Sequence, residues 1–490
     1  MASLKIVLVC LIAFGWIACP RGQIMSEEDL DTAYRGIQKM RIHLGNNTIE
    51  SFYPIVLSEL SDPTQLSQVR QLPGTYDMIV TVSSIAEEFK DLLRKYGLPF
   101  EVYVEDLRES IEEHLRENLR LAEDDKVDEF NFARYHPYDE ILQYLTDTAG
   151  RYPNLATVVN VAHTFEGRPV LAMKIGVAKS TPKRAVWMDA GLHPREWIAP
   201  ATALYFIHQL VTRYGRDQTV TDLLEKLDWY IAPVINADGY IYSWSHPARR
   251  LWRKSTSHYN NTCEDMNCTC LQMGVDLNHN WDVHWGEEMA SGDNPCNYWY
   301  HGRSPLSEPE TKGVSDFILE RRGTIQAYLT LSSYGQMWMY PYHYNATKIP
   351  PDHEDHVRLS EIATAAISRV HGKQYQHGRS ADLMVVETGT SADWAYDKAG
   401  IVHSYSIELR DTYEHEYLLP PAQILPTAQE LFPAFIQVGL YVWDGPNYEY
   451  VPYPTSGAET TGRLQDSAVY QWLLATSLMM MCIFTRAASY

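Results

Sequence analysis

Along most of the chain, short apolar runs alternate with segments of helical periodicity. The apolar runs predict strands in stretches such as RPVLAMKIGV (168–177) and AVWMDAG (185–191). Helical spacing predicts a helix in ATALYFIHQLVTRYG (201–215). Strands that alternate with helices are typical of an α/β domain with a parallel or mixed sheet. We expect such a domain over residues 130–443.

A smaller α+β unit is expected over residues 25–120. YPIVLSEL (53–60) and TYDMIVTV (75–82) have the pattern of strands, and PTQLSQVRQL (63–72) has that of a helix. IAEEFKDLLRKYG (85–97) places its larger apolar side chains on one helical stripe and ends at a glycine, which is a common helix stop.

A highly charged, helix-forming stretch, residues 107–129, follows this unit. Charged helices between domains are usually solvated connectors. The end of such a helix frays, so basic residues near it, Arg116 and Arg120, are convenient sites for a protease.

Composition excludes one class of function. The chain has 490 residues, 45% of them hydrophobic and 12% aromatic, which is enough to bury a sizeable core. Its formal net charge is -21. Nucleic-acid binding is not expected, because neutralising phosphates requires clustered Lys and Arg.

Both ends have the pattern of processing signals. Residues 1–22 contain Lys5 and then an apolar run from Ile6 to Ala18, too short to span a bilayer, which predicts a secretory signal peptide. The tail, residues 444–490, carries small residues, a spacer and an apolar run from Trp472 to Phe484. That order indicates a GPI-attachment signal; the alternative is a tail that packs or frays. We expect an extracellular or cell-surface protein.

Cysteine use agrees with secretion. Four cysteines lie outside the two ends, an even number that predicts disulfides in an oxidising compartment, with three connectivities open. Glycosylation triplets fit the same route. The cysteines are Cys263, Cys268, Cys270 and Cys296, and the triplets begin at Asn46, Asn260, Asn267 and Asn345.

The segment GLHPREW (191–197) carries candidate metal chemistry. His193 and Glu196 are three positions apart, directly after a predicted strand, where ligands bind in open α/β sheets. The pattern alone is a weak signal. Far downstream, Glu408 alternates into the apolar strand HSYSIELRD (403–411), and a buried glutamate is rare without a partner.

Several segments together resemble the zinc carboxypeptidases of the pancreatic A/B type. The resemblance covers Phe130 to about Trp443, and the upstream unit resembles the activation propeptide of that family. It implies a central mixed β-sheet flanked by helices, one catalytic zinc per chain, and removal of one C-terminal residue from a peptide. The segments are GLHPREW, VINADGY, RRLWRK, GVDLNHNW, SADW, IELRD and LLPPAQILPTAQE.

The resemblance also implies roles for individual residues. It makes His193 and Glu196 zinc ligands, Glu408 the general base, and Arg253 the cation that steadies the oxyanion. Substrate contacts would come from Arg195, Asn278 and Tyr334. It pairs Cys270 with Cys296 and leaves Cys263 and Cys268 for a second disulfide.

The sequence departs from the family where the third zinc ligand, a histidine, is expected. The corresponding strand reads YLTLSSYGQMWMYPY (328–342) and places Ser332 at the ligand position. A neutral hydroxyl is a poor zinc ligand compared with imidazole, carboxylate or thiolate. Two protein ligands therefore remain where catalytic zinc takes three.

Two further departures belong to the same site. His279 follows Asn278 where the family has an arginine that grips the terminal carboxylate, and histidine lacks its bidentate fork. Val385 stands near the position of a tyrosine that covers bound substrate. Ala392, at the selectivity position, suggests an apolar pocket or a small residue packing a turn.

Three functional hypotheses follow. The first is a family member with weak or lost activity that still binds peptide or protein C-termini. The second is a working carboxypeptidase for apolar C-terminal residues, with His279 or water as substitute third ligand. The third is a purely structural domain, because a fold does not establish a function.

Overall fold

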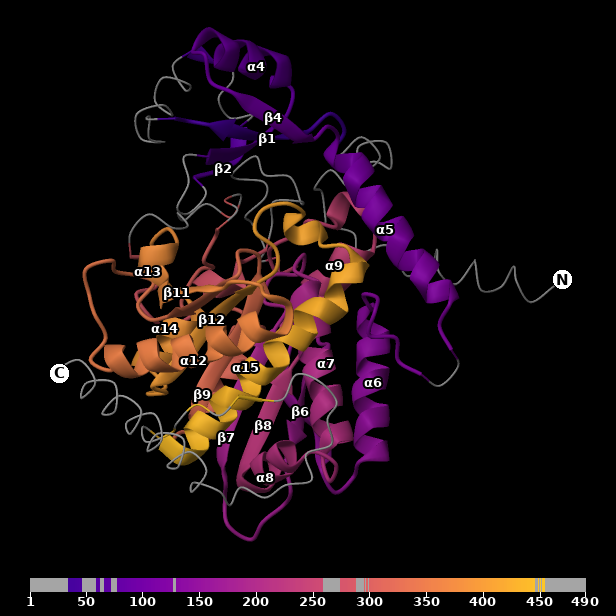
Figure 1. Ribbon diagram of the computed structural model, residues 1–490, viewed down its shortest axis with the longest axis vertical. Helices are drawn as coiled ribbons and strands as arrows, with labels where there is room; N and C mark the ends of the chain where they lie inside the picture. Colours follow the sequence, from indigo (N-terminus) through magenta and orange to yellow (C-terminus); the bar gives the residue numbers. More distant parts are fainter. Residues whose placement is uncertain are drawn as a thin grey trace, which may run out of the picture.

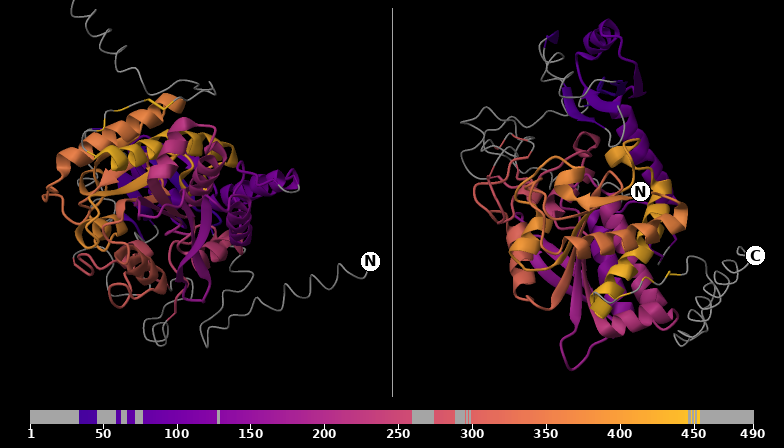
Figure 2. Two further views of the ribbon diagram at one scale, coloured as in Figure 1. Left: turned by 90° about the horizontal axis from the view of Figure 1, so that it is seen from below. Right: turned by 60° about the vertical axis from the view of Figure 1, so that its left-hand side comes forward.

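The computed structural model consists of two units, one at the end of the other (Figures 1 and 2). The N-terminal unit is a small sheet with a covering helix, and the larger unit is a helix-flanked sheet. The structure describes residues 34–45, 59–61, 66–71, 77–126, 129–258, 274–287, 295, 297, 299–445, 448, 450 and 452–453.

The N-terminal unit is an antiparallel sheet of order β2-β3-β1-β4. The helix α4 (Ala86–Lys95) packs Phe89 and Leu93 into its core, as the stripe predicted. The strands are β1 (Gln38–His43), β2 (Leu66–Gln71), β3 (Asp77–Val82) and β4 (Phe100–Val104).

One prediction in this unit is wrong. The stretch 63–72, expected to be helical, contributes the strand β2, which pairs antiparallel with β3. Backbone pairing with a neighbouring strand outweighs local spacing, since strand formation depends on context more than on propensity. The strand expected over 53–60 lies almost wholly outside the described residues.

The charged helix is present as α5 (Leu107–Glu123), but it is not solvated on all sides. His114 and Asn118 are buried against the larger unit. The His114 Nε2 lies 3.2 Å from the Leu419 carbonyl, and the Asn118 amide exchanges two hydrogen bonds with the Tyr135 backbone. One face of α5 therefore holds the two units together.

The larger unit contains the mixed sheet, in the order β11-β10-β12-β9-β7-β8-β6-β5. The pairs β12–β9, β9–β7, β7–β8 and β10–β11 are parallel and the remaining pairs are antiparallel. This confirms the predicted α/β class. The strands are β5 (Ala156–His163), β6 (Pro169–Ile175), β7 (Arg184–Ala190), β8 (Leu227–Ala232), β9 (Ile325–Ser333), β10 (Met337–Tyr340), β11 (Gln376–Arg379) and β12 (His403–Leu409).

Helices cover both faces of this sheet, so alternate residues of one strand enter different cores. In β7, Val186 and Met188 pack with the helices α7, α12 and α15 of one face (Figure 1), whereas Trp187 packs with α11 on the other. The helices are α6 (Tyr138–Arg151), α7 (Ile198–Arg213), α8 (Gln218–Lys226), α9 (Ala237–Trp244), α11 (Pro309–Leu319), α12 (His353–His371), α13 (Ser380–Leu383), α14 (Ser391–Asp397) and α15 (Ile424–Asp444).

Within the described residues, the helices fall short of the combined length and apolar content that crossing a bilayer requires. The predicted signal peptide, most of the C-terminal tail and the four cysteines lie outside the described residues. So do the glycosylation triplets except the one at Asn345, where the asparagine side chain accepts a hydrogen bond from the Thr347 amide.

Candidate functional site

The candidate site lies where the parallel strands β7, β9 and β12 end. The chain leaves β7 through Gly191, whose φ of +67° favours glycine and whose Cβ, if present, would lie 3.2 Å from the Val234 Cα. The Asn236 amide donates to the Leu192 carbonyl at 3.1 Å. This turn carries the segment 193–196 away from the sheet edge.

His193 stands between two carboxylates. Its Nδ1 is 2.8 Å from Glu196 Oε1 and its Nε2 is 3.0 Å from Asp276 Oδ1, and all three side chains are buried. Burial and Arg253 oppose the imidazolium form, but Glu196 and Asp276 outweigh them and raise the pKa of His193. Asp276 binds Nε2, the ring nitrogen that does not face Glu196. This contact orients the ring and leaves Nδ1 facing Glu196.

Ser332 takes part in the site as a hydrogen-bond donor. Its hydroxyl donates to Glu196 Oε2 at 2.6 Å, and the Ser333 backbone N–H donates to the same oxygen at 3.2 Å. Burial raises the pKa of Glu196, but His193, Arg195 and the Ser332 hydroxyl bring it below the usual value. Both oxygens of the Glu196 carboxylate are thus hydrogen-bonded to other residues of the protein.

The donor set can be compared with that of a catalytic zinc centre. Such a centre takes three protein ligands, with imidazole, carboxylate or thiolate donors. Here His193 and Glu196 supply two, and the residue beside them offers a hydroxyl whose proton is given to Glu196. The residues present therefore do not fit a three-ligand site.

Glu408 lies directly beside Ser332 in the sheet. The two residues are register partners in the parallel pair β12–β9, so their side chains leave the same face. The Glu408 side chain is buried, as its apolar surroundings in the sequence predicted. This arrangement brings the proposed general base to the edge where Glu196 lies.

Arg253 and Asp276 form a buried ion pair. The Arg253 Nε donates to Asp276 Oδ2 at 2.6 Å, and Asp276 is fully buried. Burial would raise the pKa of Asp276, but Arg253 and His193 hold it well below the usual range. Burial disfavours charge on Arg253 too, yet Asp276 keeps the pKa of the guanidinium above its ordinary value. The positive charge of Arg253 is thus matched within the site.

Asn278 and His279 follow Asp276 in a short 3-10 turn (Leu277–His279). The Asn278 Oδ1 accepts from the Ser391 backbone N–H at 3.2 Å. The ring of His279 contacts Asp276 Oδ2, Glu387 and Thr388, whereas the His193 ring, which contacts Glu196, binds Asp276 Oδ1. The structure therefore does not place His279 where a substitute third ligand would be needed.

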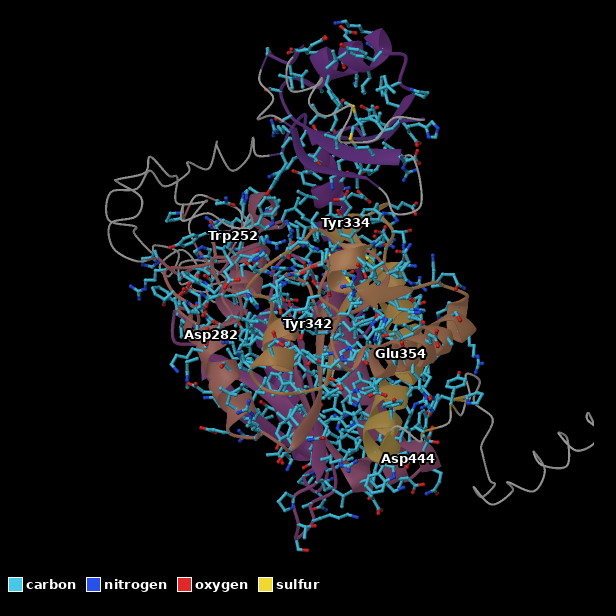
Figure 3. The ribbon with its side chains drawn as sticks, turned by 90° about the vertical axis from the view of Figure 1, so that its left-hand side faces the viewer. Trp252, Asp282, Tyr334, Tyr342, Glu354 and Asp444 are labelled. Atoms are coloured by element: carbon cyan, nitrogen blue, oxygen red, sulfur yellow. The ribbon has the colours of Figure 1, made fainter. Side chains whose placement is uncertain are left out.

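Arg195 and Tyr334 face the N-terminal unit. Arg195 stacks 3.7 Å above the Tyr417 ring and donates to its hydroxyl at 2.6 Å. Tyr334 packs edge-on against Tyr417, and Ile79 of the N-terminal unit joins this cluster. Figure 3 shows Tyr334 at the end of the larger unit nearest the N-terminal sheet.

A buried ion pair strengthens this contact between the units. Lys39 in β1 bonds to Glu416, and the side chains are 7% and 3% exposed. The Tyr103 hydroxyl donates to the other Glu416 oxygen at 3.0 Å. The N-terminal unit therefore covers the side of the site that Arg195 and Tyr334 occupy.

The two remaining predicted positions, Ala392 and Val385, differ in burial. Ala392, in the first turn of α14, is buried at 5% exposure. Val385 is 64% exposed, so most of its side chain faces solvent.

Among the described residues, the group of three side chains with ligand atoms close enough to hold a metal is Asp411, Glu414 and His415. The Asp411 carboxylate accepts backbone N–H bonds from residues 413–416. Its oxygens are already occupied by the turn that they stabilise.

Two residues of the site were not identified from the sequence. Asp276 binds both His193 and Arg253, and Glu387 reaches His279 from a distant loop. Asp276 could have been found as the acid two positions before Asn278 in GVDLNHNW, because metal-site histidines commonly pair with a carboxylate. Glu387 gave no local signal, since acids in loops are usually solvated.

The sequence is similar to those of known carboxypeptidases. The sequence profile described as zinc carboxypeptidase matches residues 141–434. Carboxypeptidase A2 of Mus musculus is 36% identical over 74% of this chain and 82% of its own length. Carboxypeptidase O of Bos taurus is 39% identical over 64% of this chain and 80% of its own length.

Solved structures extend the likeness to the fold. Thrombin-activatable fibrinolysis inhibitor aligns with a TM-score of 0.72 and 28% identity, covering 84% of this chain and 100% of that one. Carboxypeptidase A from Helicoverpa armigera gives 0.71 and 28%, covering 84% and 98%. From the matched profile, the curated relatives and the helix-flanked mixed sheet, the chain belongs to the zinc carboxypeptidase family.

Proposed function

We propose that this chain is a secreted member of the zinc carboxypeptidase family that binds the C-terminal part of peptides and hydrolyses them weakly or not at all. The single observation that carries the proposal is the Ser332 hydroxyl on Glu196 Oε2, where a third ligand would be needed. Losing a residue that merely supports a ligand costs ~10–100-fold in metal affinity or activity, and a lost ligand costs more.

The location of the residues expected to contact peptide supports the binding part of the proposal. Arg195, Asn278 and Tyr334 lie at the same end of the larger unit as His193 and Glu408. The proposed propeptide, secretion, the disulfides and the GPI anchor fit this picture but depend on the sequence patterns alone.

A second candidate function is a working carboxypeptidase with a third ligand from elsewhere. It is favoured by one set of contacts: Asp276, the partner of Arg253, binds His193, and Glu408 is the register partner of Ser332, which binds Glu196. The contacts of His279 argue against that residue as the replacement.

The test is metal content together with turnover. The purified chain, before and after limited trypsin digestion, is dialysed against zinc and analysed by atomic absorption, and release of an apolar C-terminal residue is measured on an N-acylated dipeptide. We expect well under one zinc per chain and negligible turnover. One tightly held zinc with turnover in the wild type would end the proposal.

Ser332→His tests whether the missing ligand alone, and not the other differences from the family, prevents zinc binding. We expect this variant to bind one zinc per chain, because imidazole replaces a hydroxyl beside Glu196. The matched control, Ser180→His, places the same side chain on an exposed surface and should bind no additional zinc. Failure of Ser332→His to gain zinc would contradict the assignment of position 332.

A further inference from the structure

Glu387 lies in the loop between α13 and α14 with its backbone fixed against two other segments. Its N–H donates to the His343 carbonyl at 3.3 Å, and the Gly389 N–H donates to the Val283 carbonyl at 3.0 Å. A Cβ at Gly389 would lie 2.4 Å from the His279 carbonyl oxygen, so the loop sits closer to His279 than a larger residue allows. The place of the Glu387 carboxylate is therefore set by the fold.

The ring of His279 has one engaged nitrogen and one that faces carboxylates. Its Nδ1 is 2.9 Å from the Thr388 carbonyl oxygen, which can only accept, so Nδ1 carries a proton. Its Nε2 is 3.7 Å from Asp276 Oδ2 and 3.8 Å from Glu387 Oε2. Both distances exceed a hydrogen bond. The residue is 1% exposed, and within the part of the chain that the structure describes Nε2 has no hydrogen-bond partner.

This arrangement favours a hydrogen-bond donor when the ring is neutral. A neutral His279 with its proton on Nδ1 presents an acceptor at Nε2, so that three acceptors converge. Because Arg253 is paired with Asp276, a neutral ring leaves the charge of Glu387 uncompensated, whereas a protonated ring would balance it.

The carboxylate of Glu387 is the member of this group that a ligand can reach. Its side chain is 21% exposed, whereas that of Asp276 is fully buried. Burial opposes its ionisation, but His343, His279 and Arg253 bring the pKa of Glu387 below its usual value. A ligand approaching His279 thus meets a negative charge, and a second carboxylate there is repelled.

We propose that Glu387 and His279 form a subsite for hydrogen-bond donors, so that the protein prefers peptides ending in a neutral carboxamide over the same peptides ending in a free carboxylate. The inference rests on the proposed peptide-binding function and adds its specificity. Glu387 is the specificity-determining residue, because it supplies the exposed charge.

The test compares two ligands that differ in one group. Benzoyl-glycyl-phenylalanine and its C-terminal amide are titrated calorimetrically into the full chain with EDTA present, so that metal and turnover play no part. We expect the amide to bind about tenfold more tightly to the wild type. In Glu387→Gln and Glu387→Ala the acid should gain about tenfold, which removes the preference. Thermal melts check that both variants fold.

Glu361→Gln is the matched control, because it removes one charge from the exposed face of α12 and should leave the preference unchanged. Tighter binding of the acid by the wild type, or an unchanged preference in both Glu387 variants, would overturn the inference and leave peptide binding intact. Failure of both ligands to bind would remove peptide binding itself, and the inference with it.

Discussion

The Ser332 hydroxyl donates a hydrogen bond to Glu196 Oε2 at 2.6 Å. Ser332 lies at the end of β9, and Glu196 lies in the loop that follows β7. The bond converts a position suited to a metal ligand into a support for a buried carboxylate. It also makes the serine part of the structure of the site, with measurable consequences for stability.

Ser332→Ala should destabilise the protein. The change removes one of the donors to buried Glu196, and leaving a charged group less satisfied costs about 1–3 kcal/mol. Urea denaturation followed by tryptophan fluorescence measures the difference. Ser180→Ala, on an exposed turn, should lie within about 0.5 kcal/mol of the wild type. Equal effects of the two changes would contradict the role given to the Ser332 hydroxyl.

The Arg253–Asp276 pair should show strong coupling. Asp276→Asn leaves Arg253 buried without its counter-ion, which costs about 3–5 kcal/mol, and Arg253→Gln has a similar effect. The double variant should cost clearly less than the sum of the two. The control cycle uses Lys312 and Asp316, an exposed pair worth about 0.3–0.5 kcal/mol. Additive effects at Arg253 and Asp276 would show that the pair does not act as a unit.

Glu310 should make stability fall as pH rises. The residue is fully buried, and burial raises its pKa to about 8, whereas the free side chain titrates near 4.5. Between these values the unfolded chain releases a proton that the folded chain keeps, so the free energy of unfolding decreases from about pH 4.5 to about pH 8. Glu310→Gln cannot titrate and should flatten this part of the profile by up to a few kcal/mol, about 1.4 per pKa unit.

The profile is measured by chemical denaturation at each pH. The bond that Phe165 N–H donates to Glu310 Oε1 at 2.9 Å can be kept by the amide oxygen, so the variant should fold. Glu320→Gln, at the end of α11, is the control and should leave the slope unchanged. Identical slopes for wild type and Glu310→Gln would mean that Glu310 is ionised in the folded state.

Lys39→Ala should loosen the N-terminal unit. The substitution leaves Glu416 buried with the Tyr103 hydroxyl as its remaining side-chain donor among the described contacts. Hydrogen exchange in residues 411–419 should then rise, because that segment forms the contact between the units. Lys373→Ala, at an exposed position, is the control. Unchanged exchange in both variants would show that the ion pair does not hold the units together.

The sequence predicted the class of the fold because the periodicity of the apolar residues and the lengths of the segments were both clear in the larger unit. It failed at residues 63–72, where pairing with β3 decides the structure, and at α5, where burial of His114 and Asn118 depends on residues far along the chain. Periodicity within one segment carries no information on which distant segment will cover it.

The site was predictable in its residues and less so in its contacts. His193, Glu196 and Glu408 could be named from short segments, and the structure brings them to one edge of the sheet, at the ends of β7 and β12, which flank β9. The roles of Asp276 and Glu387 depend on contacts with His193 and His279 that only the folded chain creates. The functional roles themselves stay predictions.

The buried face of α5 changes what a protease can accomplish. A cut after Arg120 would sever the covalent link, yet His114 would still touch the Leu419 carbonyl and Lys39 would still be bound to Glu416. The nicked halves should therefore co-elute on gel filtration, and uncovering of Arg195 and Tyr334 would be governed by slow dissociation, not by the rate of cleavage.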